Sequence, residues 1–319
     1  MAIFTKISFL KVHHSINSYS KSPSAITIGT FDGVHLGHQK IIKKLQSIAK
    51  QNGLQSVILT FFPHPRMVLQ SAVQIKLLNT IEERQEILSD LGLDHLVIKK
   101  FTKDFSKLSA EQYARDILVN DLNAKYVIIG YDHRFGKNRR ADIKDLINFG
   151  KQFNFKVEEI SVKDVDEVAV SSTKIRTSLN LGDVGTANTF LGYNYFLTGV
   201  VKQGKQLGKQ IGFPTANIYI KEDYKLIPKN GVYIVKSRIE NNLVYGMMNI
   251  GTNPTVDGTS QSIEVHFFDF NQNLYGIKLK IEFLKRLRDE RKFDSLEALQ
   301  SQLKIDENEA LQFIKEKAY

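Results

Sequence analysis

Short apolar runs alternate with amphipathic helical segments through the first half of the chain, and this alternation constrains the fold most strongly. Buried strands are predicted for the four runs at residues 25–29, 56–62, 95–98 and 126–130. Helices are predicted between and after them, over residues 39–50, 81–91, 109–119 and 143–153. Strands that alternate with helices imply right-handed crossovers, so this half should form a parallel, doubly wound sheet of the α/β class. The third helix begins with a capping box of Ser109 and Gln112.

The pattern changes near residue 185, where closely spaced strands follow one another without helices between them. Strands are predicted at residues 196–201, 231–239, 243–250, 262–268 and 274–283. Turn residues such as Asn241-Asn242 and Asp257-Gly258 separate them. This spacing is typical of an antiparallel barrel or sandwich. Two helices are predicted at the end of the chain, over residues 295–303 and 307–317, and two domains are expected, 1–184 and 185–319.

Composition narrows the possible functions. The 319 residues include no cysteine, which rules out disulfides and thiolate metal sites. We find no signal-peptide pattern and no run of 18 apolar residues, so we expect a cytoplasmic protein without a membrane span. The net charge of +10 suggests an anionic partner. Its densest basic cluster, Lys137, Arg139 and Arg140, is too small for a nucleic-acid arm.

The first candidate site is the segment IGTFDGVHLGH at residues 28–38, where a strand ends in a glycine-containing loop before a helix. Helix N-termini present free N–H groups and partial positive charge, so they suit phosphate. His35 and His38 are three residues apart, so their imidazoles should face one way and stabilise charge on a nucleotide triphosphate. Two ordinary surface histidines, or a zinc pair, are the alternatives that the bare motif leaves open.

The second candidate site is the segment GKQLGKQIGFPTAN at residues 204–217. It is not a P-loop, because its spacing is one residue short and Gln210 replaces the required Ser or Thr. Thr215 and Asn217 should point to one side of an extended chain, and their oxygens suit Mg²⁺ beside substrate phosphates. An ordinary glycine-rich hairpin is the alternative.

Four segments in the first half, taken in order, resemble the nucleotidylyltransferase domain of bacterial bifunctional riboflavin kinase/FAD synthetases. They are GTFDGVHLGH (HxGH), FFPHPR from residue 61, GYDHRFG from residue 130 and SSTKIR from residue 171. The resemblance implies a Rossmann-like domain that adenylylates FMN. It assigns catalytic roles to His35, His38, Ser171, Thr173 and Arg176. It assigns ligand-binding roles to Gly29, Thr30, Phe31, Asp32, Gly37, Asp132 and Ser172. Without it, Asp132 could cap a loop and the Ser-Ser-Thr run could cap a helix.

The second half resembles the riboflavin kinase domain of the same family. The resemblance rests on the segments GFPTAN, NIGTNPTV from residue 249, IEVHFFDF from residue 263 and RDERKFDSLEAL from residue 288. The resemblance implies an antiparallel β-barrel with terminal helices. In it Glu264 is the general base, and Thr215 and Asn217 coordinate Mg·ATP. Gly204, Lys209, Gly212 and Arg288 are expected to bind substrate. Taken by itself, Glu264 could equally be a solvent-facing strand residue.

The resemblance covers nearly the whole chain and implies that ATP, riboflavin and FMN are the substrates, with Mg²⁺ as cofactor. Three positions depart from the family pattern: His133 replaces Phe, Ala141 replaces Gly, and Lys209 replaces an Arg that is often present. A nucleic-acid-binding protein and a single-activity enzyme of the same fold are the alternatives. Neither nucleic acid, membrane nor an obligate protein partner is expected.

Overall fold

The computed structural model describes residues 10–70, 74–130, 133–160, 170–204, 207–255 and 258–317. The chain divides into two compact units, Met1–Ser172 and Thr173–Tyr319, and each is described by itself. The domain boundary expected after residue 184 stays a prediction. Among the helices of the described residues, none has both the length and the apolar character needed to cross a membrane.

The first unit is built on a six-stranded sheet whose neighbouring strands all run parallel, as predicted. Its strands are β1 (Lys11–His13), β2 (Ser24–Ile28), β3 (Gln55–Phe62), β4 (His95–Lys100), β5 (Ala124–Gly130) and β6 (Lys156–Ile160). Their order is β1-β4-β3-β2-β5-β6. The chain therefore reverses its direction of winding between β2 and β5, and ligands bind beyond the carboxyl ends of strands at such a point.

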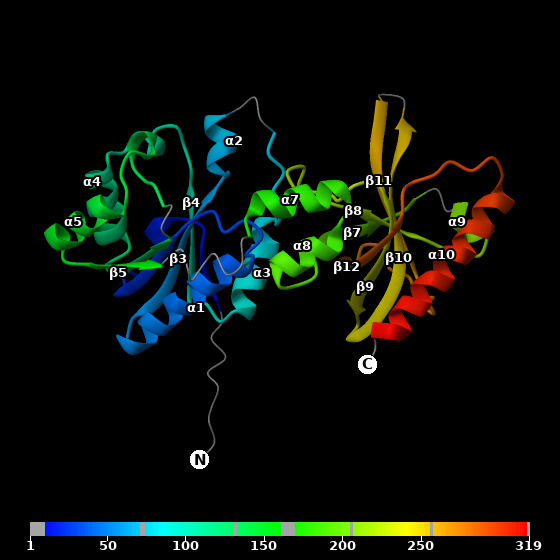
Figure 1. Cartoon of the computed structure of the whole chain (residues 1–319), viewed down its shortest axis with the longest axis horizontal. Helices are drawn as coiled ribbons and strands as arrows, with labels where there is room; N and C mark the ends of the chain where they lie inside the picture. Colours follow the sequence, from blue (N-terminus) through cyan, green and yellow to red (C-terminus); the bar gives the residue numbers. More distant parts are fainter. Residues whose placement is uncertain are drawn as a thin grey trace, which may run out of the picture. The chain divides into compact units, whose positions relative to one another are not determined.

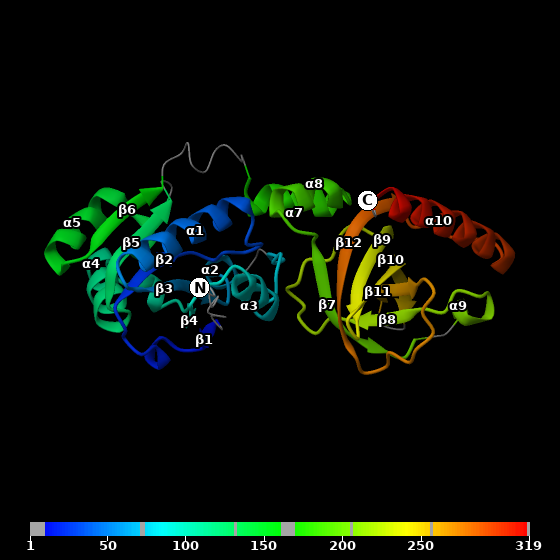
Figure 2. The ribbon, with the colours of Figure 1, turned by 90° about the horizontal axis from the view of Figure 1, so that it is seen from below.

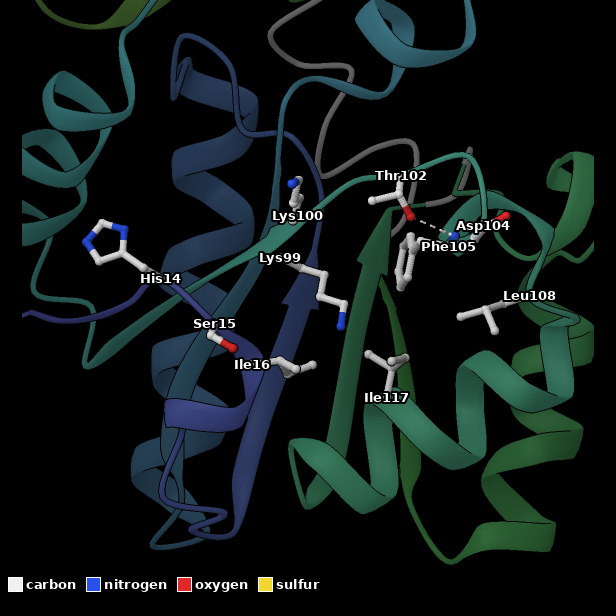
Figure 3. A pocket seen from close by; sticks show the side chains of 10 residues that line it. All are labelled: His14, Ser15, Ile16, Lys99, Lys100, Thr102, Asp104, Phe105, Leu108 and Ile117. Atoms are coloured by element: carbon white, nitrogen blue, oxygen red, sulfur yellow. Dashed lines mark hydrogen bonds between the residues drawn. The ribbon is translucent and has the colours of Figure 1, made fainter.

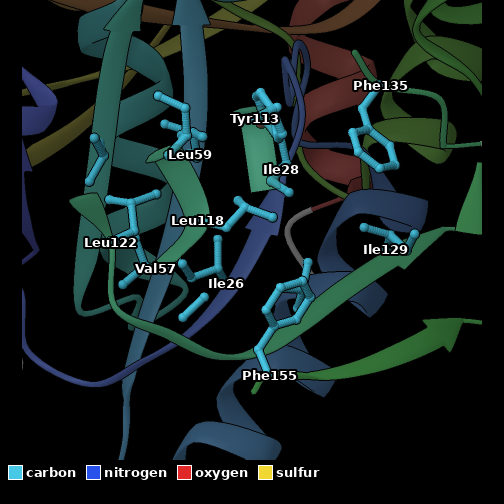
Figure 4. Close-up of a cluster of buried hydrophobic side chains, with 14 of the residues drawn as sticks. Ile26, Ile28, Val57, Leu59, Tyr113, Leu118, Leu122, Ile129, Phe135 and Phe155 are labelled. Carbon is cyan, nitrogen blue, oxygen red and sulfur yellow. The ribbon is translucent and has the colours of Figure 1, made fainter. Parts of the chain in front are cut away.

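Helices cover both faces of this sheet (Figures 1 and 2). They are α1 (Leu36–Gln51), α2 (Pro65–Leu69), α3 (Ile81–Asp90), α4 (Ala110–Gln112), η3 (Tyr113–Asp121) and α5 (Ile143–Phe153), with short 3₁₀ turns η1 (Ile16–Ser18), η2 (Phe105–Lys107) and η4 (Lys137–Arg139). On one face α1 meets α3, where the Gln46 side chain donates to the Leu91 carbonyl at 2.8 Å. On the other face η3 and α5 bury a core cluster that includes Ile26, Leu59 and Ile129 (Figure 4).

The helix predicted at residues 109–119 is only partly α-helical. Its capping box is confirmed, since Ser109 accepts from the Gln112 N–H at 3.1 Å and Gln112 accepts from the Ser109 N–H at 2.9 Å. The α-helix α4 then ends at Gln112 and continues as the π-helix η3. A capping box specifies only the first turn. The turns that follow place Tyr113, Ile117 and Leu118 in the core.

The short edge strand β1, which the sequence did not reveal, is attached through a pair of histidines. His13 Nε2 lies 2.9 Å from His95 Nδ1 on β4, and the two rings stack. His13 Nδ1 also contacts the Ser18 carbonyl at 3.0 Å, and His95 Nε2 contacts Gln55 Oε1 at 3.2 Å. Burial, with the nearby His13 and Lys11, lowers the pKa of His95 to about 4. The fold therefore favours the neutral form of the His95 ring.

The second unit contains a closed six-stranded barrel, which decides between the predicted barrel and sandwich. Its strands are β7 (Phe196–Lys202), β8 (Ala216–Tyr219), β9 (Gly231–Ile239), β10 (Asn242–Thr255), β11 (Gly258–Phe267) and β12 (Lys278–Arg288), in the order β10-β11-β8-β7-β12-β9. The prediction that the last strand begins at residue 274 was wrong. Residues Leu274 to Ile277 form a turn closed by the Ile277 N–H on the Leu274 carbonyl, with Gly276 at φ +79°.

In the described residues from Ser172 onward, the helices are α7 (Ser172–Leu181), α8 (Val184–Leu191), α9 (Leu207–Gln210) and α10 (Leu296–Lys317). The prediction of two terminal helices was wrong, because α10 is continuous. No glycine or proline interrupts residues 304–306, and Asp306 is a buried partner of Arg288. The helix α10 lies along the outside of the barrel (Figures 1 and 2). A second apolar cluster joins the two, and it includes Met247 and Ile234 of the barrel and Ala310 of α10.

Candidate active sites

The loop from β2 to α1 follows a tight backbone path at the switch point of the parallel sheet. Phe31, Gly33 and Val34 all have positive φ, at 47°, 86° and 36°. Such angles are uncommon for non-glycine residues, especially a β-branched valine, and they concentrate at functional sites. A Cβ on Gly29 would meet the Phe31 ring at 3.1 Å, so glycine fits this position best. The loop thereby delivers His35 to the start of α1.

The two predicted histidines lie together. His35 is the N-cap of α1 and its Nδ1 accepts from the His38 N–H at 3.4 Å. The rings stack with centroids 3.8 Å apart, and the Phe31 ring lies 4.8 Å from His38. This geometry confirms that both imidazoles share one side of the first turn. Gly37, predicted to bind ligand, is buried between them in that turn.

His38 carries an open hydrogen-bonding position. Its Nδ1 is buried and has no hydrogen-bond partner in the described part of the chain. Burial lowers the pKa of His38 well below its usual value, and the nearby His35 and Arg84 lower it further. The imidazole is therefore neutral at neutral pH, with a buried nitrogen that a ligand could satisfy. An approaching phosphate would favour the protonated form and so turn this ring into a charged donor.

Asp32, expected to bind ligand, faces into the protein. The carboxylate is 1 % exposed and accepts from the Leu78 N–H at 3.0 Å and the Asn79 N–H at 3.2 Å. Its Oδ1 lies 3.7 Å from Nη2 of Arg84, which is equally buried. These contacts fix the loop against the segment before α3. Direct ligand binding by Asp32 remains a prediction.

Sequence reasoning missed Arg84. Its Nη1 donates to Thr60 Oγ1 at 3.3 Å, and that hydroxyl donates to the carbonyl of Thr30, another predicted binding residue, at 3.2 Å. The signal was available, because Arg84 lies three and four residues before the buried Ile87 and Leu88. A charged residue on the buried face of a helix indicates a buried partner.

The SSTKIR segment is hydrogen-bonded to the histidine loop. The Ser172 hydroxyl donates to the backbone carbonyl of Asp32 at 2.9 Å, which brings two predicted motifs together within the first unit. Ser171 is exposed just before α7. Thr173 and Arg176 lie on α7 beyond the first unit, so their convergence with the histidines stays a prediction. Asp132 lies outside the described residues.

A cavity of ≈ 490 Å³ lies beyond the carboxyl end of β4 (Figure 3). Its walls come from the β1–η1 segment, the end of β4, the loop that follows, and η3. The lining residues are His14, Ser15, Ile16, Lys99, Lys100, Thr102, Asp104, Phe105, Leu108 and Ile117. The Phe105 ring belongs to an aromatic cluster with Phe61 and Phe101, at centroid distances of 5.6 Å. No short motif marks this cavity, because its residues are dispersed in sequence.

Two departures from the family pattern, His133 and Ala141, lie beside Phe135 in the first unit. The half-buried His133 ring stacks with Phe135 at 6.2 Å. Ala141 is buried and pairs with Phe135 through two backbone hydrogen bonds. Both replacements are therefore accommodated around Phe135.

In the second unit, strand register assembles the candidate site. Asn217 on β8 pairs with Glu264 on β11, and Glu264 pairs with Asn249 on β10. Partners in register share a face, so these three side chains form a row across neighbouring strands. Their neighbours Ile263 and Val265 are buried, which places the row on the outer face of the barrel.

Glu264 is half-buried and connected to the PTAN segment. Its Oε2 accepts from the Thr215 hydroxyl at 3.2 Å. A Cβ on Gly204 would come within 2.1 Å of the Asn217 side chain, so only glycine lets the loop pass this close. The structure therefore brings together three residues that the sequence assigned to one site. The simple solvent-facing interpretation of Glu264 does not account for this contact.

The glycine-rich segment folds as the short helix α9 and a turn. The Phe213 N–H donates to the Gly208 carbonyl at 2.8 Å, and Gly212 adopts φ +86°. Lys209 is exposed on α9. His266, which sequence reasoning missed, contacts the Pro214 carbonyl at 2.8 Å and so holds the PTAN segment on β11. Its position two residues after Glu264 places it on the same strand face, which was the available signal.

Arg288 is engaged by a buried carboxylate. Its Nε donates to Asp306 Oδ1 at 2.9 Å and its Nη2 donates to Asp306 Oδ2 at 2.7 Å. Gln302 on α10 also donates to Asp306, at 2.9 Å. This ion pair attaches α10 to the end of β12. Contact of Arg288 with substrate stays a prediction.

Comparison with known proteins gives matches in both units. A family model described as FAD synthetase matches residues 17–174, and one described as riboflavin kinase matches residues 191–314. The chain is 39 % identical to a bifunctional riboflavin kinase/FMN adenylyltransferase of Listeria monocytogenes, covering 90 % of this chain and 92 % of that protein. It is 38 % identical to the same-named protein of Bacillus subtilis, covering 90 % and 91 %.

More distant relatives span nearly the whole chain. The Escherichia coli bifunctional riboflavin kinase/FMN adenylyltransferase is 32 % identical, with 95 % of this chain and 98 % of that protein covered. A crystal structure from Streptococcus pneumoniae, titled a macrolide-efflux protein, has a TM-score of 0.83 at 30 % identity, covering 94 % of this chain and 98 % of that chain. The likeness extends over both units.

Proposed function

The chain belongs to the bifunctional riboflavin kinase/FMN adenylyltransferase family, and from this premise we propose how its two sites perform two successive ATP-dependent reactions. The enzyme phosphorylates riboflavin to FMN and then adenylylates FMN to FAD, releasing pyrophosphate. The observation that best supports this proposal is that each unit brings predicted site residues together by a hydrogen bond. The histidine loop is bonded to Ser172 in one unit, and Glu264 is bonded to Thr215 in the other.

In the adenylyltransferase reaction, a phosphate oxygen of FMN attacks the α-phosphorus of ATP. The bond from that phosphorus to the bridging oxygen breaks, and pyrophosphate leaves. His35 and His38 donate hydrogen bonds to the charge that develops on these phosphates. Removal of one such donor typically slows a reaction about 10²- to 10³-fold. Ser171, Ser172, Thr173 and Arg176 hold the phosphates in this proposal, and Gly29, Thr30, Phe31, Gly37 and Asp132 line the nucleotide site.

In the kinase reaction, Glu264 accepts the proton of the riboflavin 5′-hydroxyl while the hydroxyl oxygen bonds to the γ-phosphorus of ATP. The bond between the γ-phosphorus and the leaving oxygen breaks, and ADP departs. The Glu264 carboxylate is held for this task by the Thr215 hydroxyl at 3.2 Å. His266 supports the arrangement by holding the Pro214 carbonyl.

Thr215 and Asn217 fit a Mg²⁺ ion. The Thr215 hydroxyl donates a hydrogen bond to Glu264, which leaves the lone pairs of the Thr215 oxygen for a cation. Asn217, the register partner of Glu264 on β8, supplies an amide oxygen. Bound Mg²⁺ would neutralise phosphate charge during transfer. Gly204, Lys209 and Gly212 are proposed to contact the ATP phosphates, and Arg288 to close the site near flavin.

The setting of the reaction follows from its substrates. We place the enzyme in the cytoplasm, where ATP is supplied. The two proposed reactions require no nucleic acid, no membrane and no protein partner. The net charge of +10 suits the anionic nucleotides and flavin phosphates.

The central experiment incubates the purified chain with riboflavin, ATP and Mg²⁺ and separates the flavins by chromatography. FMN should form first and FAD should follow. If neither product forms, the proposed function is wrong. If only one of the two conversions occurs, starting from riboflavin or from added FMN, the single-activity alternative is correct.

A further inference from the structure

Lys99 directs its ammonium group into the cavity beside β4. Figure 3 shows the side chain running from the end of β4 toward the space between Ile16, Phe105 and Ile117. Its Nζ lies 5.7 Å from the Phe105 ring centroid. Within the part of the chain that the structure describes, Lys99 has no carboxylate partner and no side-chain hydrogen bond. Asp104, the cavity's acidic residue, instead pairs with Lys107 at 2.8 Å and is 90 % exposed.

Lys99 is a half-buried cation in a cavity that has both polar and apolar walls. Ile16, Phe105, Leu108 and Ile117 give the cavity apolar sides, where a charged group needs a hydrogen-bonding or anionic partner. The fitting ligand is a flat, largely apolar ring with hydrogen-bond acceptors along one edge. The isoalloxazine ring of a flavin has this character, because its pyrimidine edge carries two carbonyl oxygens.

The distance between this cavity and the histidines matches the length of a ribityl phosphate chain. β4 and β2 are separated only by β3, and adjacent strands lie about 4.8 Å apart. The carboxyl ends of β4 and β2 are therefore on the order of 10 Å apart. A ribityl phosphate chain can extend across that distance from a ring beside Phe105 toward His38.

We propose that Lys99 is a specificity-determining residue of the adenylyltransferase site, where it donates a hydrogen bond to a carbonyl on the pyrimidine edge of FMN. This inference rests on the proposed function. The ring packs against Phe105, while its phosphate extends toward the histidine loop. Lys99 thus selects flavins by the acceptors on their ring.

Replacement of Lys99 by methionine tests this role, because Lys99→Met keeps the length of the side chain and removes its donor and charge. The KM for FMN in FAD formation should rise about 10- to 100-fold, the range expected for a lost hydrogen bond to a charged group. The kcat should change less. Lys103→Met is the matched control, since Lys103 is an exposed lysine of the loop after β4 that does not line the cavity. A KM for Lys99→Met within twofold of the wild-type value would overturn the proposal.

Lumiflavin separates contact with the ring from contact with the phosphate, since it has the isoalloxazine ring and no ribityl phosphate. As a competitor of FMN in the FAD-forming reaction, it should lose affinity in Lys99→Met by the same factor as FMN. Weakened FMN with unchanged lumiflavin would assign Lys99 to the phosphate and refute the proposal. Riboflavin kinase activity, measured on the same protein, should stay unchanged. Global misfolding would lower it.

These measurements distinguish this inference from the proposed function. A wild-type chain that forms no FAD refutes the function. A wild-type chain that forms FAD, with a Lys99→Met variant of equal KM, refutes only the role of Lys99. FMN binding can also be followed by flavin fluorescence without catalysis. If the wild-type protein and Lys99→Met bind FMN with equal affinity in that titration, the inference is refuted as well.

Discussion

The two units place their candidate catalytic side chains by different means. In the first unit His35 and His38 come from one short stretch, and a strained loop with positive φ at Phe31 and Val34 orients them. In the second unit Asn217 and Glu264 come from two different strands and meet through antiparallel register, with Asn249 of a third strand beside Glu264. A loop site depends on local backbone geometry, whereas a register site depends on the whole barrel being closed correctly.

The difference extends to the chemistry of the groups. The first site offers two imidazoles, which can give positive charge to a phosphate, and one of them, His38, has a buried Nδ1 and a lowered pKa. The second site offers a carboxylate held by a hydroxyl, which can take a proton from an alcohol. Each site thus contains the type of group that the other reaction does not need, and single substitutions should separate the two activities.

The largest effect is expected for Glu264→Gln, which keeps the shape of the side chain and removes its basicity. FMN formation from riboflavin should fall about 10²- to 10⁴-fold, the usual contribution of a general base. FAD formation from added FMN should remain, because that reaction uses the first unit. Chromatography of both conversions on the same preparation provides the measurement.

Equal loss of both conversions in Glu264→Gln would contradict the division of labour between the units. Gln261→Glu serves as a control substitution on the same strand, since Gln261 is exposed on β11 three residues before Glu264. Its kinase rate should stay close to that of the wild type.

His38→Ala should give the next largest effect, in the opposite direction. FAD formation should fall about 10²- to 10³-fold, because one donor to the developing phosphate charge is removed. The kinase reaction should continue, so FMN should accumulate from riboflavin and ATP. A time course of the three flavins measures this. Rapid FAD formation by the variant would show that the buried Nδ1 of His38 has no part in the reaction.

The smallest effect concerns pH and should affect the first unit alone. Burial, His13 and Lys11 lower the pKa of His95 to about 4, below the unfolded value of about 6.5, with Asp94 opposing them. The neutral form is therefore favoured in the fold, and its contribution to stability is lost as pH falls from about 6.5 toward 4. Thermal unfolding between pH 7 and 4.5 should show this loss. His95→Gln should flatten the pH dependence, and an unchanged slope in that variant would contradict the assignment.

The sequence predicted the alternating parallel half, the barrel half and the main motifs, because these depend on local periodicity and on short spacings. It also predicted that His35 and His38 share one side, since helical geometry settles that. It did not predict that Asp32 turns inward to Leu78 and Arg84, because that contact joins residues 46 and more positions apart. The cavity beside Lys99 was equally hidden, since its walls come from four dispersed segments.

The predicted ends of strands and helices were wrong where tertiary contacts determine them. The break predicted within the terminal helix was wrong because Asp306, a polar residue in the middle of α10, faces inward to Arg288. From the sequence, a charged residue at that point resembles the end of one helix and the start of another. Only the position of β12 shows that it has a partner.

The Arg288–Asp306 pair also limits how this chain can change over generations. Loss of either partner would leave the other charge without its ionic partner, at a cost of about 3 to 5 kcal/mol of folding stability, whereas exchange of both for apolar residues of similar volume is often neutral for stability. The two positions should therefore vary together in a mutational library, although 18 residues separate them. In evolution the two positions should therefore be replaced together rather than one at a time.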